Sequence, residues 1–158
     1  MKRVYVETTI PTFYFERRTS ADMVARREWT RAWWAEALDR DELVTSAPVL
    51  DELKQGVFPA RDECLRLIET LPLLPVDHAV LDIVQAYVTH RLMPRDPVGD
   101  ALHLALASYH RCDFLVTWTC EHLANANKFA HIRRVHGVLG LLVPSLVTPL
   151  ELIGEQDG

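Results

Sequence analysis

The chain has 158 residues, of which 49% are hydrophobic and 25% charged. This composition excludes a disordered or fibrous chain and predicts one globular domain over residues 1–158. The formal net charge of −5 excludes a broadly basic nucleic-acid coat, although it leaves room for a local basic patch. No apolar run approaches the roughly 20 residues of a membrane span, so we expect no membrane association.

The three cysteines, Cys64, Cys112 and Cys120, are odd in number and form no C-x-x-C pair. The first strand-like run starts at once, with no signal or targeting segment before it. Together these features favour reduced thiols in a cytoplasmic protein.

Apolar runs and helical stretches alternate through the first half of the chain. Ser46 is expected to cap the second of these helices, and Gly56 to end it. The elements expected here are a strand at 3–9, a helix at 20–40, a strand at 43–46 and a helix at 47–56.

The same alternation continues in the second half. Asp77 and Asp96 are expected to cap the two helices that follow them, and Thr148 with Glu151 to form a capping box. The expected elements are a strand at 73–76, helices at 78–93 and 97–110, a strand at 114–117, a helix at 120–128, a strand at 143–147 and a helix from 149. This order predicts an α/β fold with a parallel sheet covered by helices on both faces. Ligands of such sheets bind at the carboxyl ends of the strands, where the strand order reverses.

Acidic residues fall where that edge should lie. Glu7 ends the first strand, and it is either a solvated strand end or part of a site. Asp51 and Glu52 are helix neighbours about 100° apart, so one should face inward and the other outward. Each of them alone is also compatible with a solvated helix charge.

Asp100 opens a helix, "GDALHLALA", whose next residues are apolar on all sides. A charge at the edge of a core is costly unless it is paired or bound to a metal. Carboxylates from three elements would repel one another, and a hard divalent cation removes that repulsion. We therefore expect Glu7, Glu52 and Asp100 to share one Mg²⁺ or Mn²⁺ ion. His103, on the same helix, is expected to be a hydrogen-bonded core histidine.

Four segments, "YVETTIP", "VTSAPVLDELKQG", "GDALHLALA" and "FLVTWTCEHLANA", occur in the order and spacing of a known family. The chain resembles the PIN-domain family over about residues 3–153, and in particular the VapC-like toxin ribonucleases. The resemblance implies a three-layer α/β/α sandwich with a central parallel sheet. It also implies hydrolysis of RNA phosphodiester bonds with Mg²⁺ or Mn²⁺ held by acidic residues.

The family's acidic set maps onto Glu7, Glu52, Asp100 and Thr119. Glu7 stands in place of the usual aspartate, and Thr119 in place of a fourth acid. The resemblance therefore implies three metal ligands and a threonine that hydrogen-bonds a water or the phosphate, with one metal expected rather than two. Glu121 is a candidate for compensating the missing charge.

Substrate contacts and partners also follow from the resemblance. RNA phosphates would be gripped by local basic residues, because the net charge is negative. The candidates are Arg17, Arg18, Lys128, Arg133 and Arg134, although Arg17 and Arg18 fit a solvated loop equally well. Relatives of this kind pair with a small antitoxin protein and form homodimers, and we expect both here.

Two other interpretations remain open. A degenerate member of the family would bind RNA or a partner without cutting, since Thr119 weakens the acidic set. A metal-dependent phosphatase needs a nucleophilic aspartate where Glu7 stands, so it fits less well. Trp118 is either a base-stacking residue or a packed aromatic at a strand end.

Overall fold

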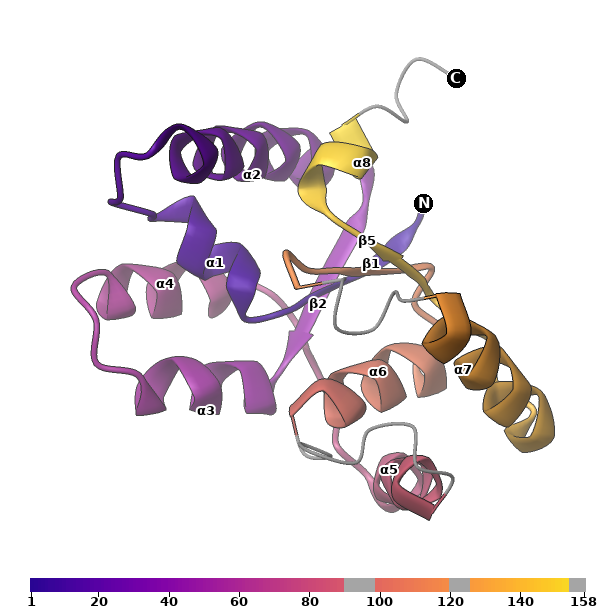
Figure 1. Cartoon of the computed structure of the whole chain (residues 1–158). Coiled ribbons are helices and arrows are strands. Elements are labelled where there is room, and N and C mark those ends of the chain that lie inside the picture. The colour runs from indigo at the N-terminus through magenta and orange to yellow at the C-terminus, as the bar shows by residue number, and fades with distance from the viewer. Residues whose placement is uncertain (90–98, 120–125, 154–158) are drawn as a thin grey trace.

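The structure is a computed structural model that describes residues 1–89, 99–119 and 126–153. These residues form five strands and eight helices (Figure 1). The strands are β1 (Arg3–Val6), β2 (Glu42–Ser46), β3 (Leu73–Leu74), β4 (Phe114–Val116) and β5 (Ser145–Val147). The helices are α1 (Thr9–Tyr14), α2 (Ala21–Arg40), α3 (Ala47–Gln55), α4 (Arg61–Ile68), α5 (His78–Thr89), α6 (Gly99–Tyr109), α7 (Ala126–Leu139) and α8 (Pro149–Ile153).

All five strands are parallel and follow the order β3-β2-β1-β4-β5. In β1, Tyr5 pairs with Val44 of β2 on one side and with Leu115 of β4 on the other. These central strands are short apolar runs, as expected of strands that are covered on both faces. The predicted α/β class with a parallel sheet is thus confirmed.

Helices lie on both sides of the strands, an arrangement consistent with a three-layer sandwich. Figure 1 shows α2 and α8 on one side of the sheet and α5 and α6 on the other. The core between these layers includes Trp33, Tyr5, Leu104 and Leu115, all with little or no exposed surface. Helix α6 is buried on most of its faces, as its apolar sequence predicted.

The strand order reverses between β1 and β4. From β1 the chain moves outward to β2 and β3, and it then returns to the other side of β1 for β4 and β5. The carboxyl ends of β1 and β4 therefore border the crevice in which open α/β sheets bind ligands. Glu7 directly follows β1, and Thr117 directly follows β4.

Several local predictions can be compared with the structure. Asp77 caps α5 by accepting the Val80 amide, and Thr148 and Glu151 form the predicted capping box before α8. Gly56 follows the last residue of α3, as predicted. Ser46 occupies the N-cap position of α3, as predicted, but its hydroxyl bonds the Tyr5 hydroxyl at 2.7 Å and caps no helix amide.

Some boundaries also differ from the prediction. The first strand ends at Val6, and residues expected in its last part begin α1 instead. Helix α7 continues to Leu139, well beyond the predicted end at 128. The predicted cap Asp96, the thiol of Cys120 and the candidate acid Glu121 lie outside the described residues.

The buried thiols of Cys64 and Cys112 are free. Within the described parts of the chain, no helix combines the length and apolar character needed to cross a membrane.

Candidate functional site

Glu7 is a buried carboxylate at the centre of the crevice, with 8% of its surface exposed. Its Oε1 accepts the Thr9 amide at 2.8 Å and the Thr117 hydroxyl at 3.1 Å. None of the ion pairs among the described residues involves Glu7. Burial raises the pKa of Glu7, and the hydrogen bonds from Thr9 together with the charge of His103 only partly oppose that rise. The interpretation of Glu7 as a solvated strand end is therefore wrong.

Glu52 approaches the same crevice from α3. Asp51 faces solvent while Glu52 is partly buried, as the helix geometry predicted. One oxygen of Glu52 accepts the Thr8 hydroxyl, and the other lies 2.7 Å from Nε2 of His103. Because Thr8 directly follows Glu7, the first of these bonds brings the middle of α3 close to the end of β1.

His103 joins the two carboxylates electrostatically. Its Nδ1 lies 2.6 Å from the Tyr5 hydroxyl, and its Nε2 faces Glu52, so this buried ring is bonded on both sides. Burial alone would lower the pKa of His103, but the bond to Glu52 and the charges of Glu52, Glu7 and Asp100 outweigh it and raise the pKa. The pKa of Glu52 is lowered, because the bond and charge of His103 overcome its own desolvation. Both shifts have the direction expected when a histidine and a carboxylate stabilise each other's charged form.

Asp100 lies in the first turn of α6, three residues before His103, and its charge reaches that ring. The residues of the predicted metal set thus come from the end of β1, from α3 and from α6, and their charges influence one common histidine. The described residues nevertheless contain no group of three or more His, Cys, Asp or Glu side chains in a metal-holding arrangement. Both oxygens of Glu52 are engaged by His103 and Thr8.

Thr119 is connected to Glu7 through a second threonine. The Thr117 hydroxyl donates to Glu7, so the Thr119 hydroxyl, 3.0 Å from that of Thr117, donates to Thr117. The Thr119 amide bonds the same oxygen at 3.0 Å. The threonine in place of an acid therefore lies in the crevice as a neutral hydrogen-bonding group.

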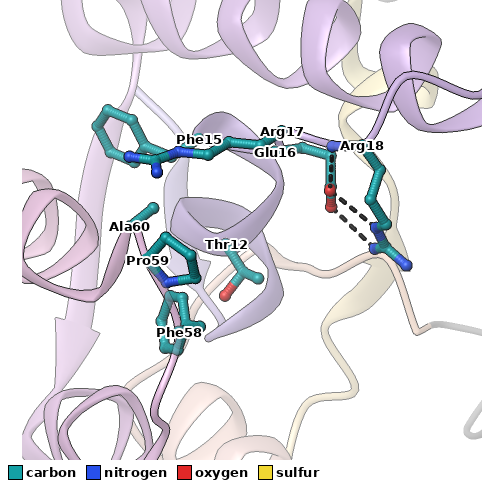
Figure 2. A pocket seen from close by; sticks show the side chains of 8 residues that line it. All are labelled: Thr12, Phe15, Glu16, Arg17, Arg18, Phe58, Pro59 and Ala60. Carbon is teal, nitrogen blue, oxygen red and sulfur yellow. Dashed lines mark hydrogen bonds and ion pairs between the residues drawn. The ribbon is translucent and has the colours of Figure 1, made fainter.

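The predicted RNA-contacting residues lie on two parts of the chain, the segment after α1 and helix α7. Arg17 and Arg18 help to line a separate pocket of about 400 Å³, shown in Figure 2. Arg17 pairs with Glu63 at 3.2 Å and Arg18 with Glu16 at 2.8 Å. The Arg18 hydrogen bonds hold the pKa of Glu16 at about 2.

The other predicted basic residues lie on α7. Arg133 and Arg134 are exposed, and the side chain of Lys128 lies outside the described residues.

A group of aromatic and basic side chains next to Glu7 was not identified from the sequence. Trp118 follows β4, and its amide donates to the Thr9 hydroxyl at 2.9 Å. Its indole Nε1 donates to Thr30 of α2 at 2.8 Å, and the ring of Trp29 stacks on it. Trp118 is thus packed at the strand end, as one of its two interpretations held. The only signal in the sequence was "RREWT", in which Arg26 and Trp29 are one helical turn apart.

In comparisons with known proteins, no family model matches this chain and no significant match was found among curated proteins.

Proposed function

We propose that this protein is a Mg²⁺- or Mn²⁺-dependent endoribonuclease of the PIN type, with its site at the carboxyl ends of β1 and β4. The observation that carries the proposal is Glu7: a carboxylate buried at the strand-order reversal, without an ion-pairing lysine or arginine among the described residues. Burying an unpaired charge is costly, and burial raises the pKa of this group. A hard cation bound there would stabilise its charged form.

The donor set fits such a cation chemically. Carboxylates of Glu7 and Asp100 would hold it, with Glu52 reaching it directly or through water. Mg²⁺ is usually bound through one or two carboxylates and keeps several waters, so a cage of three side chains is not required. The chemistry that the ion supplies is activation of water for attack on phosphorus and neutralisation of charge on the phosphate oxygens.

Neighbouring side chains and amides orient the carboxylates of the site. The Thr9 amide and Thr117 hydroxyl fix the orientation of the Glu7 carboxylate, and His103 fixes that of Glu52. The neutral Thr119 hydroxyl gives its proton to Thr117, and its lone pairs are left to accept a hydrogen bond from a water. A single cation is expected, because the set contains three carboxylates.

The biological context belongs to the same proposal. The protein would be the toxin of a toxin–antitoxin pair, acting in the cytoplasm, inhibited by a small antitoxin protein and assembled as a homodimer.

The test is cleavage of a 5′-labelled single-stranded RNA by purified protein with Mg²⁺, Mn²⁺ or EDTA. The proposal predicts metal-dependent products ending in a 3′-hydroxyl and a 5′-phosphate. Asp100→Asn should lower the rate by at least about 100-fold, while Asp51→Asn, an exposed neighbour of Glu52, should not. Circular dichroism and thermal melting check that both variants fold. Cleavage that is equal in wild type and Asp100→Asn, or absent with every metal, contradicts the proposal.

A second candidate, an RNA-binding module that does not cut, is favoured by one observation. Both oxygens of Glu52 are engaged by His103 and Thr8. Tight RNA binding without cleavage at any metal concentration would favour this candidate.

A further inference from the structure

We infer that the outer ring of an aromatic stack next to the crevice binds an unpaired nucleobase of the RNA substrate, with Arg26 contacting the adjoining phosphate. We call Arg26, Trp29 and Trp118, together with Phe13, the α2 aromatic cluster. This inference rests on the proposed function, because it specifies single-stranded RNA as the substrate of the same crevice.

The cluster is physically continuous with the acidic site. The Trp118 amide bonds the Thr9 hydroxyl, and the Thr9 amide bonds the Glu7 carboxylate. Two hydrogen bonds therefore connect the backbone of Trp118 to the buried acid. A nucleotide lying on the cluster would place a neighbouring phosphodiester at the carboxyl ends of β1 and β4.

The inner ring of the stack is fixed in place. The Trp118 indole donates to the Thr30 hydroxyl, which in turn donates to the Arg26 carbonyl on the preceding turn of α2. Trp29 stacks on Trp118 with ring centroids 6.2 Å apart and an interplanar angle of 26°. Phe13 of α1 also packs against Trp118, with ring centroids 5.9 Å apart and the planes tilted by 58°.

The outer ring offers an accessible aromatic surface. Trp29 is 36% exposed, which is a large fraction for a tryptophan stacked on another one. Stacking on an aromatic ring is the usual way in which proteins hold unpaired bases, and it tolerates every base because each has a π-face. A base pair within a duplex has no free face for such a ring.

The cation of the cluster is available for a phosphate. The Arg26 guanidinium lies 5.5 Å from the Phe13 ring centre and 5.6 Å from that of Trp118. Among the described residues it takes part in no hydrogen bond or ion pair, although the charge of Asp22, four residues earlier, reaches it. Arg17 and Arg18, by contrast, are paired with Glu63 and Glu16. Arg26 is therefore a better candidate than Arg17 and Arg18 for contacting an RNA phosphate.

The experiment measures binding of a fluorescein-labelled 12-nucleotide oligouridine in EDTA, so that no metal-dependent cleavage takes place. Trp29→Ala should weaken binding by about 5- to 160-fold, the range for losing one stacked base. Trp29→Phe should retain most of the affinity and Trp29→Leu should not, because only phenylalanine preserves a π-face. Arg26→Ala should also weaken binding and should lower the slope of log K against log salt by about 0.7, the value for one phosphate contact to a single strand.

Two exposed residues of the same helix are matched controls. Arg31 also lies over an aromatic ring, with its guanidinium 5.1 Å from the Tyr14 ring centre, and Leu38 is an exposed apolar side chain. Arg31→Ala and Leu38→Ala should change the affinity by less than twofold. A duplex of the same length should bind more weakly than the single strand and should not respond to Trp29→Ala.

The outcome separates this inference from the proposed function. Cleavage by the wild type with a KM that Trp29→Ala leaves unchanged would overturn the inference and leave the nuclease intact. RNA binding that depends on Trp29, without any cleavage, would support the inference and contradict the nuclease. Equal losses in Trp29→Ala and the Leu38→Ala control would also overturn the inference.

Discussion

Two buried histidines of this fold, His103 and His136, show how one partner changes the behaviour of a group. Each ring bonds a tyrosine hydroxyl, His103 that of Tyr5 at 2.6 Å and His136 that of Tyr87 at 2.7 Å. His103 is 3% exposed and His136 fully buried. The pKa of His103 is nevertheless raised, and that of His136 is lowered.

The difference lies in the second partner of each ring. His136 faces the Leu142 carbonyl and the Ser108 hydroxyl, which are neutral, so burial lowers its pKa. His103 faces the carboxylate of Glu52, with Glu7 and Asp100 nearby. Burial disfavours the charged form of both rings, and it decides the pKa of His136 because the polar partners there are neutral. Around His103 the carboxylates outweigh burial and favour the charged ring. The raised pKa of His103 therefore reports that several carboxylates surround this ring.

The largest difference should follow from replacing each ring by leucine in buffer without metal. His103→Leu leaves Glu52 without its cation, and we expect a loss of about 2 kcal/mol, less than for a fully buried pair because Glu52 is partly exposed. His136→Leu removes only neutral hydrogen bonds, so we expect a loss of about 1 kcal/mol. Urea unfolding at pH 7 measures both. Equal losses would show that the carboxylate is not what distinguishes the two rings.

The pH dependence of stability should have opposite signs for the two rings. The pKa of His136 is lowered in the folded protein, so its contribution to the free energy of unfolding is fully present above pH 6.5, the ordinary histidine pKa. This contribution is lost as the pH falls below 6.5, because the unfolded chain then binds a proton more readily than the folded one. The pKa of His103 is raised in the folded protein, so its contribution to the free energy of unfolding is fully present below pH 6.5. This contribution is lost as the pH rises through the raised pKa.

Unfolding free energies between pH 5 and 9 check these signs. His136→Leu should flatten the decline below pH 6.5 by up to about 1.4 kcal/mol per pH unit. His103→Leu should not flatten it. A decline that is the same in both variants would contradict the assignment of opposite shifts.

The smallest difference should be the one between the two tyrosines, because each network contains one tyrosine in the same role. Tyr5→Phe and Tyr87→Phe each remove one hydroxyl from a histidine, and each should cost about 1 kcal/mol in urea unfolding. Tyr5→Phe also removes the bond to Ser46, so its loss should be slightly the larger. A loss several times greater for one of them would mean that the tyrosine, and not the carboxylate, separates the networks.

The sequence predicted the sheet well because buried parallel strands leave a simple signature. "FLV" and "VYV" are short apolar runs between helical stretches, and they form β4 and β1. Helix α1 was missed because its sequence, "TIPTFY", combines proline with β-branched and aromatic residues of low helix propensity. Its residues Ile10 and Pro11 are buried, so tertiary packing outweighs that propensity.

The candidate site was predicted in part. Positions 7 and 100 could be proposed because a strand end and a helix start place charges at the sheet edge, whereas position 52 was proposed from the family resemblance. His103 was expected to be a hydrogen-bonded core histidine, which the structure confirms, but its partner on another helix has no local signal. The same holds for Trp29, whose stacking on Trp118 joins residues far apart in the chain.

The most direct test of a divalent-cation site at this crevice is Mn²⁺ titration followed by NMR of the histidine ring protons. Mn²⁺ broadens nearby resonances, and the effect falls steeply with distance. We predict that the His103 signals disappear at Mn²⁺ levels that leave those of His136 visible, and that Asp100→Asn abolishes this selectivity. Signals of the two rings that broaden together, or not at all, would contradict a cation held by Glu7, Glu52 and Asp100.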